Sequence, residues 1–218
     1  SATATGPAPG SVREAYVSFR ADLPAGGSLK VSFVNHDVTC WKADQAACEA
    51  GLDQEGMLKF ASGWKFRISA TAGGVTKSAD AAQMLAAGKW LYWLRGPVVT
   101  QVVVQDLSPQ ETTSFGWRLS NGIMLDEAED KYRSLMPRFV LTFYPGWAGV
   151  KGECILENTW AARSQDQVYD LSIQTSAPEP VYSFRELRHY ALTRWRKTFW
   201  DGQAPGEVRF DYNFPYLV

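Results

Sequence analysis

The sequence contains few of the residues that build metal centres and hydrolytic active sites. Only two histidines, His36 and His189, occur among 218 residues, which excludes a histidine-rich metal cage and leaves little material for a Ser/His/Asp triad. The nucleophile elbow G-x-S-x-G, the phosphate-binding P-loop and the dinucleotide-binding fingerprint are also absent from the sequence. We therefore predict no metal site and no cofactor, and the sequence does not favour an enzyme.

Long apolar runs and an excess of charge of one sign are missing too. No run approaches the roughly 20 apolar residues of a membrane-spanning helix, so no membrane span is expected. The 22 Lys and Arg residues nearly balance the 23 Asp and Glu residues, and a chain of this kind has no long-range field that would attract a polyanion. Nucleic acid is therefore not expected as a partner.

Cysteine is also scarce, with three residues in the chain. Cys40 and Cys48 bracket the short polar loop CWKADQAAC, and a disulfide between them would stabilise that loop in an oxidising compartment. The alternative is a pair of free thiols. Cys154 lies in the apolar run GECILENTW and is expected to be a buried free thiol, since a buried unpaired cysteine behaves as a small hydrophobic residue.

The two ends of the chain differ from its middle. Residues 1–12 are rich in Gly, Pro, Ala and Ser, which predicts a flexible N-terminal arm, and residues 13–218 are predicted to form a single β-sandwich domain. A polar start of small residues is typical of a mature secreted protein and equally of a linker. With the cysteine pair, it leads us to expect a secreted or cell-surface protein. The apolar end NFPYLV indicates either a fragment of a longer protein or an end that pairs with a neighbour.

Most of the remaining segments alternate apolar and polar residues with the period of a β-strand. A hairpin is expected over 15–38, and further strands are expected within 57–74, 89–107, 137–160 and 167–175. The turn at Pro145-Gly146 is too short for a helical crossover, so its two strands should pair antiparallel. The fold class predicted is mainly β, an antiparallel β-sandwich or distorted barrel with one or two short helices.

Helices are expected at two places. The Ala-rich segment 78–88 fits a helix of one to three turns or an irregular cover. In segment 183–200, apolar residues recur at helical spacing and Ser183 with Glu186 forms a capping box, which predicts one helix. The rival interpretation is a strand over 189–200 that turns back at Asp201-Gly202.

Two stretches resemble a known family. WLRGPVVTQVVVQD (93–106) contains a strand led by Gly-Pro, and RFVLTFYPGWAGVKGECILENTW (138–160) contains a Tyr-centred strand, a tight turn and a strand ending in Glu-Asn. These stretches resemble the core of the antiparallel sandwiches of galactose-mutarotase-like and exo-rhamnogalacturonan-lyase-like proteins. The resemblance implies a sandwich that accompanies modules acting on plant polysaccharides. No catalytic motif of that family is present to carry over.

Catalytic candidates are His189, Tyr190 and Arg194, because a uronic-acid lyase needs an arginine on the substrate carboxylate and a tyrosine or histidine to move the α-proton. The competing interpretation places His189 on the exposed basic face of a helix. A hydrolase would need two converging carboxylates, drawn from the loop LDEAED (125–130) or from Glu153 and Glu157; the loop is more typical of a solvated surface. His36 with its neighbours Asn35 and Asp37 is more typical of a turn than of a cation site.

Binding candidates are aromatic residues whose flat faces can stack on sugar rings, and the chain has nine Trp. These candidates are Trp147, Trp90, Tyr92, Trp93 and Trp160. Trp147 ranks first because it lies at a turn, where side chains tend to be exposed. For each of them the alternative is ordinary packing in the core.

The function expected from the sequence is a non-catalytic extracellular carbohydrate-binding or accessory β-sandwich module. Its partner would be a polysaccharide or glycan. One alternative is a structural subunit of an extracellular assembly such as a filament, coat or surface layer, joined to neighbouring copies by exchange of a terminal strand or arm. The other alternative is a polysaccharide lyase or hydrolase.

Overall fold

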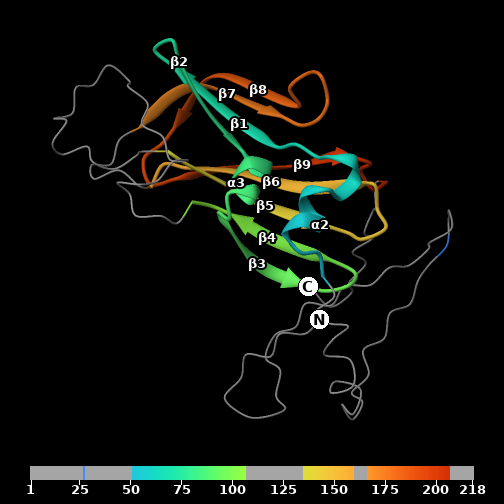
Figure 1. Cartoon of the computed structure of the whole chain (residues 1–218). Coiled ribbons are helices and arrows are strands. Elements are labelled where there is room, and N and C mark those ends of the chain that lie inside the picture. The colour runs from blue at the N-terminus through green and yellow to red at the C-terminus, as the bar shows by residue number, and fades with distance from the viewer. Residues whose placement is uncertain (1–26, 28–50, 107–134, 160–165, 207–218) are drawn as a thin grey trace, which may run out of the picture.

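The computed structural model describes residues 27, 51–106, 135–159 and 166–206. The described part is mainly β and forms two antiparallel sheets, which lie as two layers in Figure 1. The predicted fold class is therefore confirmed. The hairpin expected over 15–38, the cysteines Cys40 and Cys48, the carboxylates of 125–130 and Trp160 all lie outside the described residues.

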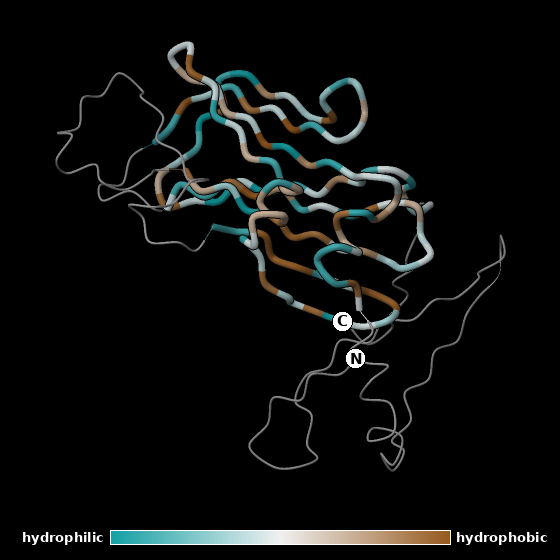
Figure 2. The backbone as a smooth tube through the Cα atoms, viewed as in Figure 1, coloured by the Kyte–Doolittle hydropathy of each residue, from teal (hydrophilic) through white to brown (hydrophobic). Residues whose placement is uncertain are grey.

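One layer is a four-stranded sheet with the strand order β2-β1-β7-β8. Its strands are β1 (Arg67–Ala72), β2 (Val75–Asp80), β7 (Gln167–Gln174) and β8 (Tyr182–His189). β1 and β2 form a hairpin around Gly73 and Gly74, which both have positive φ. Along β7 buried and more exposed residues alternate, and Figure 2 shows the hydropathy of the strands of both layers.

The other layer is a five-stranded sheet with the strand order β3-β4-β5-β6-β9. Its strands are β3 (Trp90–Arg95), β4 (Thr100–Val104), β5 (Met136–Phe143), β6 (Gly149–Glu157) and β9 (Arg194–Gly202). The chain passes from β6 to the other layer for β7 and β8 and then returns, so that β9 pairs with β6. The antiparallel hairpin of β5 and β6 predicted around Pro145-Gly146 is confirmed.

Short helices close one side of the sandwich. α2 (Gln54–Leu58) is capped by Asp53, whose carboxylate accepts the Gly56 amide at 2.8 Å, and a 3₁₀ turn, η2 (Phe60–Ser62), follows it. α3 (Ala81–Ala86) is capped by Asp80 and packs against β2 of one sheet and β4 of the other. The helix predicted within 78–88 is thus confirmed.

The helix predicted over 183–200 is wrong, because this segment forms β8, a tight turn and β9. A bulge explains the misleading spacing. Three steps along β8, from Phe184 to Leu187, face two steps along β7, and Glu186 takes a φ of 51° within the bulge. The extra residue shifts the strand period, so that apolar residues appear at helical spacing. The rival interpretation, a strand over 189–200, agrees with β9 over Arg194–Gly202, and the segment into which it was expected to turn back lies outside the described residues.

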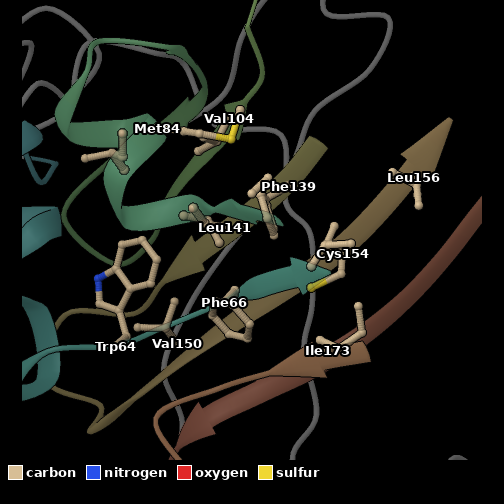
Figure 3. Close-up of a cluster of buried hydrophobic side chains, with 14 of the residues drawn as sticks. Trp64, Phe66, Met84, Val104, Phe139, Leu141, Val150, Cys154, Leu156 and Ile173 are labelled. Carbon is tan, nitrogen blue, oxygen red and sulfur yellow. The ribbon is translucent and has the colours of Figure 1, made fainter. Parts of the chain in front are cut away.

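The core lies between the two sheets. Figure 3 shows apolar side chains from α3, β4, β5, β6 and β7 pointing toward one another, together with Trp64 and Phe66 from the segment that precedes β1. Phe66 and Cys154 are both fully buried. Cys154 is a free cysteine, as the sequence predicted, and burial and the neighbouring Glu153 charge both raise the pKa of its thiol.

Contacts of Tyr182 and Asp201 join the two sheets to each other. Tyr182 of β8 packs on Trp195 of β9, with ring centroids 5.5 Å apart. Asp201, at the end of β9, is buried and accepts the Lys65 amide at 2.6 Å and the Ser176 amide at 3.1 Å, as well as the Ser176 hydroxyl. Because Lys65 and Ser176 flank strands of the other sheet, the Asp201 carboxylate links the two layers.

Candidate functional site

The candidate site lies on the outer face of the five-stranded sheet, the face turned away from the core. Side chains alternate between the two faces of a strand. Gly152 and Cys154 of β6 face the core, where a Cβ atom on Gly152 would lie 2.6 Å from the Phe66 ring. The intervening residues of β6 therefore point outward. By the same alternation, Phe199 of β9 packs against the core and the outer face receives Arg194, Arg196, Thr198 and Trp200.

One end of this face carries an aromatic hollow of about 310 Å³. Its lining consists of Tyr144, Pro145, Trp147, Trp200 and Pro205. We use the name aromatic hollow for these five residues. They come from the β5–β6 turn, the end of β9 and the segment after it, which the pairing of β6 with β9 brings together.

The rings of the aromatic hollow are held in place by specific contacts. Tyr144 and Trp200 are stacked, with centroids 6.0 Å apart and planes inclined by 22°. The indole Nε1 of Trp147 donates a hydrogen bond to the backbone carbonyl of Gln203 at 2.8 Å. The turn itself is closed by the Trp147 amide, which donates to the Tyr144 carbonyl at 2.9 Å, and Gly146 supplies the positive φ of 82° that this turn needs. All three aromatic side chains remain partly exposed.

Partial burial also shifts the pKa of the tyrosine that lines the aromatic hollow. Desolvation raises the pKa of the Tyr144 hydroxyl above its ordinary value of 10.0. The Tyr144 side chain is therefore an uncharged phenol at neutral pH, and it can donate a hydrogen bond at the rim of the hollow.

A second hollow, the ion-pair groove, crosses the same face and has a volume of about 300 Å³. Its apolar floor is formed by residues of β4, β5 and β6, and Trp93 and three arginines rise around it. The complete lining is Trp93, Gln101, Val103, Arg138, Val140, Glu153, Ile155, Arg194 and Arg196. Trp93 is 65% exposed, so its ring is available for contact from solvent.

The three arginines of the ion-pair groove are joined to two carboxylates. Glu157, at the margin of the groove, lies 2.9 Å from the Arg138 guanidinium and 2.8 Å from that of Arg194. Glu153 lies 3.4 Å from the Arg196 guanidinium. The Glu157 side chain is only 7% exposed, whereas that of Arg196 is 65% exposed. The face therefore offers guanidinium donors and carboxylate acceptors side by side.

Glu153 and Glu157 do not form the carboxylate pair of a glycoside hydrolase. They stand four residues apart on one strand, a separation of about 13 Å at the usual rise of a strand, which exceeds the distances of about 5 to 9.5 Å that hydrolases use. Each carboxylate is also occupied by an ion pair with an arginine.

Trp90, Tyr92 and Trp93 do not act as one surface. Trp90 and Tyr92 form a T-shaped pair with centroids 4.8 Å apart, and the Tyr92 hydroxyl donates to the Leu52 carbonyl at 2.8 Å. This contact ties Tyr92 to the segment that precedes α2. Of the three, only Trp93 lines the ion-pair groove.

Of the catalytic candidates His189, Tyr190 and Arg194, Arg194 lines the ion-pair groove and the other two do not. The expectation that His189 is exposed on a helix is wrong, because it ends β8 and is only 4% exposed. Its Nδ1 lies 2.8 Å from the Tyr169 hydroxyl and its Nε2 lies 3.1 Å from the Thr193 carbonyl. Tyr190 is exposed at the turn, while Arg194 lines the ion-pair groove.

The surroundings of His189 shift its pKa and hold its ring by hydrogen bonds. Desolvation lowers the pKa of its imidazole below the ordinary value of 6.5, and the hydrogen bond with the Thr193 backbone opposes this shift. Burial likewise raises the pKa of the Tyr169 hydroxyl. In this neutral pair the Tyr169 hydroxyl donates to Nδ1 and Nε2 donates to the Thr193 carbonyl.

Trp200 and Tyr144 were missed by the sequence analysis. The sequence predicts Trp200 on a helix and Tyr144 only as the centre of a strand. Reading residues 194–202 as a strand would have placed Trp200 on the same face as Arg194 and Arg196, which is the signal that could have found it.

Within the described ranges, no three His, Cys, Asp or Glu residues are grouped so that they could hold a metal ion. No helix in that part of the chain has the length and apolar character needed to cross a membrane. Comparison with protein-family models, with curated proteins and with solved structures gave no match to this chain.

Proposed function

We propose that the protein is a non-catalytic carbohydrate-binding β-sandwich module and that a sugar ring stacks in the aromatic hollow. The observation that carries this proposal is the geometry of Trp147, Trp200 and Tyr144, three partly exposed rings that line one cavity of about 310 Å³. Ordinary core aromatics are covered by other side chains, whereas these rings share an open space.

The fixed positions of the rings favour binding. A ligand that must order mobile side chains loses about 0.5–1.5 kcal/mol for each of them. Here the Trp147 indole is already held by its hydrogen bond to Gln203, and Trp200 is held by stacking on Tyr144. Flat apolar rings with polar atoms at their edges suit the apolar faces and peripheral hydroxyls of sugars.

The non-catalytic and extracellular parts of the proposal have different support. The wide separation and ion pairing of Glu153 and Glu157, and the burial of His189 with both ring nitrogens in hydrogen bonds, argue against the lyase and hydrolase alternatives within the described residues. The extracellular location is supported by the predicted Cys40–Cys48 disulfide.

Retention on insoluble polysaccharides tests the proposal. The protein is passed over cellulose, chitin, xylan and mannan, and the fraction retained is compared with that of Trp147→Ala and Trp200→Ala. We expect both variants to lose most of the retention, with Trp147→Phe retaining part of it because a flat ring remains. Leu192→Ala is the matched control, since Leu192 is 66% exposed but does not line the aromatic hollow.

Thermal unfolding of each variant separates a binding effect from a folding effect. A melting temperature close to that of the unaltered protein, together with lost retention, supports the proposal. Unchanged retention in both Trp147→Ala and Trp200→Ala would remove the hollow as the binding site. Failure of the unaltered protein to be retained on any of the polysaccharides would refute the proposed function.

A structural role in an extracellular assembly is the second candidate. Apolar side chains are exposed on and around the edge strand β8, where Val181, Phe184, Tyr190 and Leu192 are all at least 40% exposed. Exposed apolar residues at a sheet edge are typical of surfaces that pair with another chain. The bulge at Glu186 opposes this role, since bulges disturb the regular pairing of an edge.

A further inference from the structure

The aromatic hollow and the ion-pair groove lie on one continuous surface. Trp200 belongs to the hollow, while Arg196 and Arg194 belong to the groove. All three occupy alternate positions of β9, so their side chains point to the same face. Arg196 stands four residues from Trp200, which is about 13 Å along a strand.

The ion-pair groove is elongated across the sheet. It is lined by residues of all five strands, from Trp93 on β3 to Arg194 on β9. Neighbouring strands are about 4.8 Å apart, so the groove spans about 19 Å. A single sugar ring cannot contact both Trp93 and Trp200, whereas a chain of several sugar units can.

The charges of the groove favour an uncharged chain. Glu157 is held by Arg138 and Arg194, and Glu153 is held by Arg196. A polyanion would approach these two carboxylates and would compete with them for the guanidinium groups. Hydroxyl groups donate and accept hydrogen bonds, so an uncharged sugar chain can use both members of each ion pair without breaking it.

We infer that the outer face of the five-stranded sheet binds a linear, uncharged polysaccharide along its length. One sugar unit stacks in the aromatic hollow, and later units cross the ion-pair groove and reach Trp93. This inference rests on the proposed function and specifies the class of its ligand: an internal stretch of a neutral chain, in preference to a single sugar, a chain end or an acidic polymer.

Calorimetric titration with oligosaccharides of increasing length tests the inference. The probes are gluco-, xylo- and manno-oligosaccharides with β-1,4 linkages, from disaccharide to hexasaccharide, and a galacturonic acid hexasaccharide. In at least one neutral series we expect the affinity to rise tenfold or more with length. The galacturonic acid hexasaccharide should bind more weakly than the neutral hexasaccharide of that series, and 1 M salt should leave the neutral binding unchanged because no net charge is neutralised.

Variants of Trp93 and Trp200 test how the ion-pair groove and the aromatic hollow each contribute to the rise of affinity with oligosaccharide length. Trp93→Ala should abolish the tenfold gain with length, and Trp93→Phe should restore part of the gain. Trp200→Ala should weaken both the disaccharide and the hexasaccharide. Because Trp93 is 65% exposed, its replacement should not prevent folding, and a circular dichroism spectrum matching that of the unaltered protein checks this.

Several results would overturn the inference. Equal affinity for disaccharide and hexasaccharide, an unchanged gain in Trp93→Ala, or stronger binding of the galacturonic acid hexasaccharide would each contradict it. Retention on an insoluble polysaccharide that depends on Trp147, with no binding of any neutral oligosaccharide, would refute this inference but leave the proposed function standing. Failure of the unaltered protein to be retained on any of the insoluble polysaccharides would refute the proposed function itself.

Discussion

Adding one methyl group to Gly152 tests which face of β6 is turned to the core, and therefore which residues form the outer face. A Cβ atom built on Gly152 lies 2.6 Å from two carbons of the Phe66 ring and 2.7 Å from a third. Carbon atoms pack at about 3.5–4.0 Å, so the ring would have to move by about 1 Å. Phe66 is fully buried and packs next to Trp64, which leaves it little room to move.

The expected cost can be worked from this geometry. Overpacking a core by one carbon costs about 1–3 kcal/mol, and a contact this short belongs at the upper end of that range. The loss of glycine's freedom in the unfolded chain returns about 0.4–1 kcal/mol. We therefore expect Gly152→Ala to lower the free energy of unfolding by about 2 kcal/mol.

Urea unfolding followed by tryptophan fluorescence measures this change. Gly206→Ala is the matched control, because no heavy atom lies within 4 Å of a Cβ at Gly206, and its effect should stay within about 0.5 kcal/mol. The double variant Gly152→Ala, Phe66→Leu should cost less than the sum of the two single changes, since the smaller side chain relieves the clash. Equal effects of Gly152→Ala and Gly206→Ala would refute the assigned faces of β6.

Three further predictions concern the link between the sheets, the buried histidine and the native mass. Asp201→Ala should lower the free energy of unfolding by about 3 kcal/mol, because it leaves the Lys65 and Ser176 amides without their charged acceptor; urea unfolding measures this, and a loss below that of Gly206→Ala would contradict it. Burial lowers the pKa of His189 below 6.5, so the unfolded chain binds a proton at His189 more tightly than the folded chain does. The contribution of neutral His189 to stability is therefore complete above pH 6.5 and is lost as the pH falls through the pKa of His189 in the folded state. His189→Gln should therefore flatten the stability profile between neutral and mildly acidic pH, and parallel profiles would refute this. Light scattering after size-exclusion chromatography should give a monomer near 24.3 kDa, whereas large ordered species that are lost in Phe184→Ser would favour the assembly role.

Several strands of the sandwich could be predicted from the sequence because they bury one face, whereas β2, whose first four residues are exposed, could not. In β7 and β1 buried and less buried residues alternate regularly, so the period of two is visible without any knowledge of the partners. α3 was equally accessible, since Asp80 is a good N-cap and alanines follow it. Segment 183–200 failed because the bulge at Glu186 inserts one residue into β8 and disturbs its period.

The candidate site depends on contacts that no local pattern reports. Trp147 could be selected because it lies at a turn, but its hydrogen-bond partner Gln203 is 56 residues further along the chain. The chain visits the other sheet before β9 returns to β6, and the sequence does not specify which edge β9 will join. Trp200 and Tyr144 therefore could not be assigned to the same hollow in advance.

The arginines of β9 show how the secondary structure changes the meaning of a charge pattern. On a helix, Arg188, Arg194 and Arg196 would form part of a basic surface suited to an anionic ligand. On a strand, Arg194 and Arg196 point to one face, and the register of β9 with β6 sets them against Glu157 and Glu153. The same residues then line a groove beside Trp93 in which each arginine is paired with a carboxylate. It is this pairing, fixed by register and not by composition, that favours an uncharged sugar chain as the ligand.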